Sequence, residues 1–123
     1  MSGFIFIRNL DRQNQDPARV KFCDSFPCRL RGLMFRARLD PDEGLLLVQG
    51  RDSRLDASIH MFFVPFDLNV VWINSDMEVV SKVIAKPWRP AYFPERPARY
   101  ILEIHPDRWE EYRAGERVEF IHE

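Results

Sequence analysis

The chain has 123 residues, the usual size of one domain, and 46% of them are hydrophobic while 30% are charged. A chain of this length buries roughly two-thirds of the surface that it exposes when unfolded, so it needs neither a disulfide nor a metal to fold. The formal net charge is −1 with acidic and basic residues intermixed, which argues against a nucleic-acid-binding protein. We therefore predict a single domain over residues 1–123.

The N-terminal segment has an apolar run of only four residues, which is too short for a signal peptide or a membrane span. Cys23 and Cys28 are the only cysteines and lack the CxxC spacing. We interpret them as two buried or half-buried thiols in a reducing compartment, and we expect a soluble, cytoplasmic protein. No metal or cofactor is predicted, because His60, His105 and His122 lie far from the cysteines along the chain.

The N-terminal third predicts two strands and a helix. Residues 4–8 and 18–23 have the alternation of strands, and polar residues 11–17 form a loop between them. Ser25 is a good helix N-cap, and Pro27 in the first turn loses no hydrogen bond. The apolar stripe of the predicted helix consists of Phe26, Leu30, Leu33 and Met34. Gly32 lies in the middle of this helix, which indicates a close approach of another backbone.

The apolar midsection predicts further strands. Residues 45–49 suit a strand that is buried on both faces, and residues 58–64 form a strand that ends or bends at Pro65. Residues 68–73 and 78–84 are the two strands of a β-hairpin, because the four residues between them have turn composition.

Residues 87–97 contain four prolines and three aromatic residues, so they form an irregular loop that packs its rings downward. This loop is either a lid on the core or a wall of a binding groove. Residues 99–105 then form a strand, a helical turn follows Pro106, and residues 117–121 form the last strand. The prediction is a mostly β (α+β) fold, an antiparallel, partly closed β-barrel of about seven strands with one or two short helices.

Several short sequence blocks carry a family resemblance. They are Arg31-Gly32-Leu33-Met34-Phe35-Arg36, Gly44-Leu45-Leu46, Met61, Asp67, Val79-Val80 and Ala98-Arg99-Tyr100-Ile101-Leu102-Glu103. In this order and spacing, over about residues 18–121, the chain resembles the uncharacterised family named domain of unknown function 192. It departs from the common pattern at His60 to Phe63, where the family usually has Trp-Met-Lys-Asn, and at His105 to Asp107. The resemblance implies a compact β-rich fold with a small helix and implies no activity.

Polar side chains within apolar strands, beside an aromatic loop, are typical of a pre-formed pocket. The candidate ligand-binding residues are Arg36, His60, Asp67, Trp88, Arg99 and Glu103. Asn69 is a further polar residue that lies among apolar residues in the sequence. We expect a non-enzymatic binding or accessory domain, a monomer or weak dimer, that holds a small anionic ligand or a protein partner. Each residue also has a structural alternative, such as a hydrogen-bonded His60 in a strand or an Asp67 that caps a turn or pairs with Arg36.

The alternative hypothesis is a hydrolase or lyase in which His60 acts with Asp67 or Glu103, because a histidine with a carboxylate partner can transfer protons near neutral pH. No nucleophile motif and no phosphate-binding loop accompanies these residues. A third hypothesis is an interaction module that uses the aromatic loop. The first hypothesis requires that His60, Asp67 and Arg99 meet at one accessible cavity.

Overall fold

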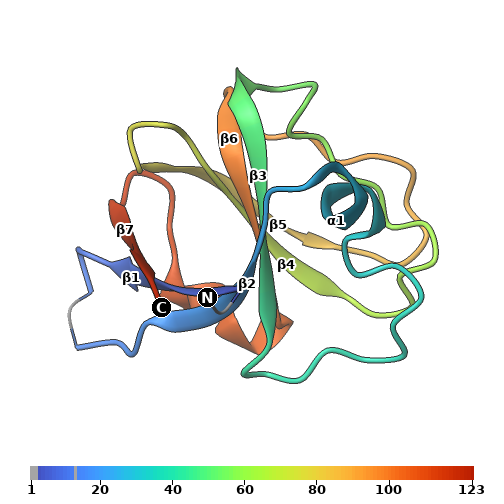
Figure 1. Ribbon diagram of the computed structural model, residues 1–123, viewed down its shortest axis with the longest axis horizontal. Coiled ribbons are helices and arrows are strands. Elements are labelled where there is room, and N and C mark those ends of the chain that lie inside the picture. Colours follow the sequence, from blue (N-terminus) through green and yellow to red (C-terminus); the bar gives the residue numbers. More distant parts are fainter. Residues whose placement is uncertain (1–2, 13) are drawn as a thin grey trace.

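The computed structural model describes residues 3–12 and 14–123, and its strands form one mixed, curled sheet in the order β5-β4-β6-β3-β2-β1-β7 (Figure 1). The strands are β1 (Phe4–Asn9), β2 (Ala18–Cys23), β3 (Gly44–Ser53), β4 (Leu68–Ile73), β5 (Val79–Ala85), β6 (Ala98–Ile104) and β7 (Val118–His122). The helices are α1 (Phe26–Arg31) and the 3₁₀ helix η1 (Pro106–Glu111). The predicted mostly β, partly closed barrel is confirmed. The β2–β3 pair is parallel and the other pairs are antiparallel.

At one end of the curled sheet, each edge strand bonds to the turn that precedes the other edge strand. Val79 at the start of β5 donates to the carbonyl of Glu116 (2.8 Å) and accepts from the amide of Gly115 (2.8 Å). Val118 of β7 donates to the carbonyl of Met77 (2.9 Å). These bonds satisfy part of each exposed edge, which a β-rich chain must protect against pairing with other molecules.

The two faces of the sheet carry separate apolar cores. One face packs around the fully buried Tyr112 and contains Val20, Leu46, Val71 and Leu102. The other face contains Leu45, Leu47, Val70, Trp72 and Ile101 and is covered by residues that follow α1 and by the loop between β3 and β4. Figure 1 shows α1 and these loops on one side of the central strands, with β1 and β7 on the other.

The β4–β5 hairpin is confirmed, with Leu68 opposite Ala85 and Ile73 opposite Val79. All six residues of β4 are buried. Strand β4 has a neighbouring strand on each side and an apolar core on each face, which accounts for the almost continuous apolar run in its sequence.

Two predicted elements are wrong. The helix ends at Arg31, because Gly32 adopts φ +51° as the C-cap, and Phe26 and Leu30 of the predicted apolar stripe are exposed. Residues 58–64 are not a strand. Only Ile59 forms a bridge, with Tyr92, and a turn from Met61 to Val64 precedes Pro65.

Cys23 and Cys28 form a disulfide that links the end of β2 to α1, so the prediction of two free thiols is wrong. The turn at Ser25, which caps the helix, brings the two Cα atoms to 5.5 Å, within the range of bonded cysteines. Disulfides are typical of oxidising compartments, and the cytoplasmic location stays a prediction. No helix among the described residues is long and apolar enough to cross a membrane.

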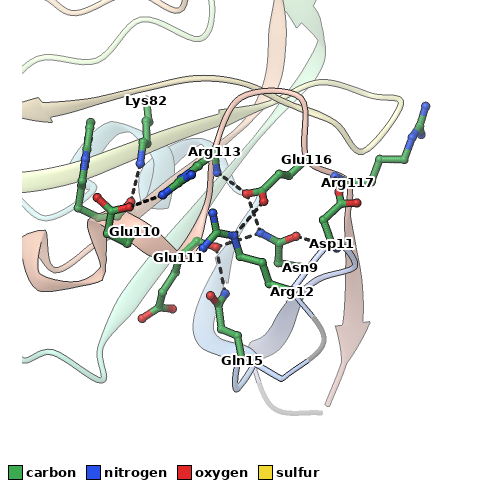
Figure 2. A network of polar contacts seen from close by, with 11 residues as sticks. Asn9, Asp11, Arg12, Gln15, Lys82, Glu110, Glu111, Arg113, Glu116 and Arg117 are labelled. Atoms are coloured by element: carbon green, nitrogen blue, oxygen red, sulfur yellow. Dashed lines mark hydrogen bonds and ion pairs between the residues drawn. The ribbon is translucent and has the colours of Figure 1, made fainter.

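A polar network closes the end of the sheet near η1 (Figure 2). The buried Asn9 donates to the carbonyl of Glu111 (2.9 Å) and to Oε1 of Glu116 (3.1 Å), and its own oxygen accepts from the amide of Asp11 (3.0 Å). Arg12 donates to the other oxygen of Glu116 at 2.8 Å. The network therefore ties three segments together: the loop after β1, the end of η1 and the turn before β7.

Replacing Gly44 with alanine is expected to destabilise the protein by about 2 kcal/mol, since overpacking a core usually costs 1–3 kcal/mol. A Cβ atom at Gly44 would lie 2.7 Å from Cγ1 of Val20 and 2.8 Å from Cγ2 of Ile104. Urea unfolding measures the loss. Gly50→Ala is the matched control in the same strand, because a Cβ there meets nothing within 4 Å. Equal unfolding midpoints for the two variants would contradict this close packing.

Candidate functional site

A cavity of about 80 Å³ lies between α1 with its following turn, strands β3 and β6, the start of β4 and the loop around His60. Its apolar lining consists of Leu30, Leu33, Met34, Leu47, Ile59, Met61, Val64, Leu68 and Ile101. Its polar lining consists of Arg29, Arg31, Gln49, Ser58, His60 and Glu103, and Gly32 completes the wall. The end of the helix at Gly32 allows the next two residues to turn toward the sheet.

Glu103 is the buried acid of this pocket. It lies one residue before the end of β6, opposite Leu45 of β3 and Val70 of β4, and only 5% of its surface is exposed. No hydrogen bond or ion pair reaches its carboxyl group from any residue that the structure describes. Burial raises the pKa of Glu103 to about 7. A carboxyl group with such a pKa can either donate or accept a proton near neutral pH.

His60 lines the same pocket but lies in a loop, with its side chain exposed. Its Nδ1 atom accepts a hydrogen bond from the amide of Phe62 (3.2 Å). Among the described residues it makes no hydrogen bond to Glu103 or Asp67. The pair that the enzyme hypothesis requires is therefore not formed in this structure.

Three other candidate residues make hydrogen bonds outside this pocket and do not line it. Arg36 donates to Glu43 (2.7 Å), and this hydrogen bond is the main reason that the pKa of Glu43 lies below its usual value. Asp67 accepts from Lys86 (2.9 Å). Arg99 donates to the backbone carbonyl of Gln49 (3.0 Å). The prediction that His60, Asp67 and Arg99 meet at one cavity is wrong, because Asp67 and Arg99 bond to partners outside the pocket and do not line it. Only His60 and Glu103, of the six candidates, line this pocket.

Trp88 belongs to an exposed row of rings beside the pocket. Its ring centroid lies 5.0 Å from that of Phe63, which in turn lies 4.9 Å from that of Phe35. All three residues have positive φ, a conformation that is rare for aromatic residues and is often retained at functional sites. Phe35 follows Met34 and Phe63 precedes Val64, and both of these neighbours line the pocket. The row therefore flanks one side of the site.

The proline-rich loop that carries Trp88 packs against the segment around His60. Ile59 and Tyr92 exchange two backbone hydrogen bonds, and the amide of Trp88 donates to the carbonyl of Met61. Ile59 and Met61 both line the pocket. The loop thus packs against a segment that forms part of the pocket wall and holds that segment in place.

Sequence reasoning missed several residues of the pocket, notably Gly32, Gln49 and Ser58. The signal for Gly32 was present, because a glycine shortly after an N-cap and a proline can end a short helix as well as occupy its middle. Asn69 is fully buried, and neither its side-chain nitrogen nor its side-chain oxygen has a hydrogen-bond partner in the part of the chain that the structure describes, but it does not line this pocket. It follows the alternation of β4 and lies on the opposite face from Val70. Among the described residues, no three potential ligands are placed to hold a metal ion.

Residues 8–120 match the model of the DUF192 family, which is described as an uncharacterised family (ACR). The chain belongs to this family. An UPF0127 protein of Pyrococcus furiosus is 39% identical over 95 residues, which cover 77% of this chain and 78% of that protein. An UPF0127 protein of Thermococcus kodakarensis is 41% identical over 85 residues, which cover 69% of this chain and 52% of that protein.

Two solved structures share the fold of this DUF192 protein. One, from Sinorhizobium meliloti, is described as a candidate transcription regulator; it has a TM-score of 0.81, 20% identity and coverage of 98% of this chain and 96% of that one. The other, a protein of unknown function from Novosphingobium aromaticivorans, has a TM-score of 0.77, 18% identity and coverage of 94% and 83%. At these identities the comparison shows the fold alone. The family is uncharacterised, as the sequence resemblance implied.

Proposed function

We propose that the chain is a binding domain whose pocket holds a small polar group of a ligand or of a partner protein's side chain. The observation that supports this proposal is Glu103, a buried acid that faces a cavity and has no hydrogen-bond or ion-pair partner for its carboxyl group among the described residues. An ionisable group in apolar surroundings lowers stability unless another group pairs with it. A bound ligand would supply that missing partner.

The size of the pocket limits what it can hold. Pockets for drug-sized ligands have volumes of roughly 300–1,000 Å³, whereas this cavity measures about 80 Å³. Only one functional group with a few carbon atoms fits, so the remainder of a larger ligand would lie outside. The exposed rings of Phe35, Phe63 and Trp88 offer an apolar surface there. This arrangement also suits a side chain of a partner protein, because aromatic residues are enriched at interfaces.

The anionic ligand that the sequence favours would bind differently. It would contact Arg31, which is exposed and whose side chain makes no hydrogen bond or ion pair with any described residue. Arg29 is less available, since its Nη1 atom donates to the carbonyl of Asp24 (2.6 Å). An anion is therefore expected at the rim of the pocket, away from Glu103. The charge of the bound ligand therefore distinguishes binding beside Glu103 from binding at the rim of the pocket.

Methyl resonances of methionine provide the test. Met34 and Met61 line the pocket, whereas Met77 packs on the other face of the sheet and serves as an internal control. We expect the methyl signals of Met34 and Met61 to shift on titration with at least one of three small probes, butylamine, butyrate or butyramide, while that of Met77 stays unchanged. Unchanged signals from both pocket methionines with all three probes would exclude the proposed binding function.

A catalytic role is the second candidate, because the pKa of Glu103 is about 7, which suits a general acid or base, and because His60 lines the same pocket. Hydrolysis of a small activated ester such as p-nitrophenyl acetate tests it. The hypothesis predicts a rate above that of buffer which both His60→Gln and Glu103→Gln lower by at least about tenfold. A rate equal to that of buffer, or one that neither substitution changes, would reject this ester-hydrolase activity.

A further inference from the structure

We infer that the group bound beside Glu103 is the protonated amine of a ligand or of a lysine side chain. This inference rests on the proposed binding function and specifies its ligand. The geometry that carries it is a single buried carboxyl group that faces a cavity with apolar and polar walls, and no cation among the described residues is in contact with it. A cation with hydrogen-bond donors is the chemical complement of such a group.

The charged groups around the pocket support this choice. From α1, Arg29 is directed to the backbone carbonyls of Asp24 and Val48, and Arg31 is exposed to water. From the loop between β3 and β4, His60 is exposed, and its Nδ1 atom already accepts a hydrogen bond. Strands β3 and β4 contribute no charged side chain to the lining. The ionised carboxylate of Glu103 therefore needs a positively charged partner that is not among the described residues.

The shape of the pocket favours an ammonium group on a short carbon chain. Its volume of about 80 Å³ is well below the roughly 300–1,000 Å³ of pockets for drug-sized ligands. Leu47, Leu68 and Ile101 provide apolar walls for methylene groups. An ammonium group is compact and has three donors, whereas a guanidinium group is planar and needs more room. We accordingly expect an alkylamine to fit better than an arginine side chain.

Gly32 leaves space next to the carboxyl group. A Cβ atom built at Gly32 would lie 3.9 Å from Oε1 of Glu103, so any longer side chain would reach into the volume beside the acid. The positive φ of Gly32 disfavours other residues there as well. The end of α1 therefore leaves the carboxyl group accessible to a small group.

The inference predicts that binding depends on pH. The amine pairs with the ionised carboxyl group, so below neutral pH the proton on Glu103 must leave when the amine binds. With a pKa of about 7, roughly one-tenth of Glu103 is ionised at pH 6 and nine-tenths at pH 8. The affinity for an alkylamine, which stays protonated throughout, is therefore expected to rise about tenfold over this range.

The experiment titrates butylamine at pH 6 and pH 8 and follows the methyl signals of Met34 and Met61. We expect saturable shifts with an affinity that is about tenfold higher at pH 8, and no shift with butyrate or butyramide at equal ionic strength. Glu103→Gln should abolish the response. Glu95→Gln, which removes an exposed carboxyl group outside the pocket lining, should preserve it.

The outcomes separate this inference from the proposed function. If butyrate or butyramide shifts the methyl signals of Met34 and Met61 and butylamine does not, the binding function is supported and the inference of an amine ligand is wrong. Equal binding of butylamine by the protein and by Glu103→Gln would also overturn the inference. If no probe shifts the signals, both proposals fail.

Discussion

Glu103→Gln is expected to stabilise the protein by about 3 kcal/mol at pH 8 and by only about 1 kcal/mol at pH 5. Burial raises the pKa of Glu103 from 4.5 to about 7, and one pKa unit corresponds to about 1.4 kcal/mol. Between these two values the folded protein keeps a proton that the unfolded chain has lost. The contribution of Glu103 to the free energy of unfolding therefore falls as the pH rises from about 4.5 to 7, and it stays at this lower value at higher pH. Glutamine is neutral at every pH and avoids this loss.

Urea unfolding of both proteins at pH 5, 6, 7 and 8 measures the effect. Glu95→Gln is the matched control, since the side chain of this exposed glutamate has no hydrogen-bond or ion-pair partner among the described residues and its replacement should change stability little at any pH. A stability difference between the protein and Glu103→Gln that does not grow with pH would show that another group neutralises the buried acid. The amine proposal adds one expectation: butylamine should stabilise the protein more at pH 8 than at pH 6 and leave Glu103→Gln unaffected.

A stabilising substitution at Glu103 would also bear on function. Side chains that lower the stability of the folded state are common at binding and catalytic sites, where the required chemistry conflicts with optimal packing. Glu103 has the features of such a group, because it is buried, ionisable and unpaired among the described residues. The pH dependence of stability therefore tests the physical basis of the proposed site without knowledge of the ligand.

Asn9→Ala is expected to destabilise the protein by about 3 kcal/mol. The substitution removes three hydrogen bonds of a side chain that is only 2% exposed, and each contributes about 1 kcal/mol. It leaves the carbonyl of Glu111 and the amide of Asp11 without this partner at the end of the sheet (Figure 2). Urea unfolding at neutral pH measures the loss.

Asn14→Ala is the control for this substitution. Asn14 lies in the loop that follows Asn9, is exposed, and takes part in none of the hydrogen bonds described for the network. We expect its removal to change the free energy of unfolding by less than about 0.5 kcal/mol. If Asn9→Ala were equally mild, the network would be a surface feature without a role in closing the sheet.

The sequence by itself determined the family and the seven strands of the sheet, although it also predicted a strand over residues 58–64 that does not form. Alternating or continuous apolar runs are local features, and burial on one or both faces of a sheet imposes them directly. Residues 68–73 and 78–84 therefore predicted the β4–β5 hairpin almost residue for residue. The blocks around Arg31 and Glu103 identified the DUF192 family without any knowledge of their contacts.

Only the tertiary structure decided which polar side chains meet. Asp67 was a reasonable candidate until Lys86, in another segment, proved to be its partner. Glu103 and His60 line one pocket because β6 pairs with β3 and β4 and because the turn after α1 leaves space above them. Strand register, loop paths and the end of a helix at Gly32 set these contacts, and they depend on residues distant in the sequence. Local periodicity specifies which face a residue occupies, but the partner that it finds there depends on the whole fold.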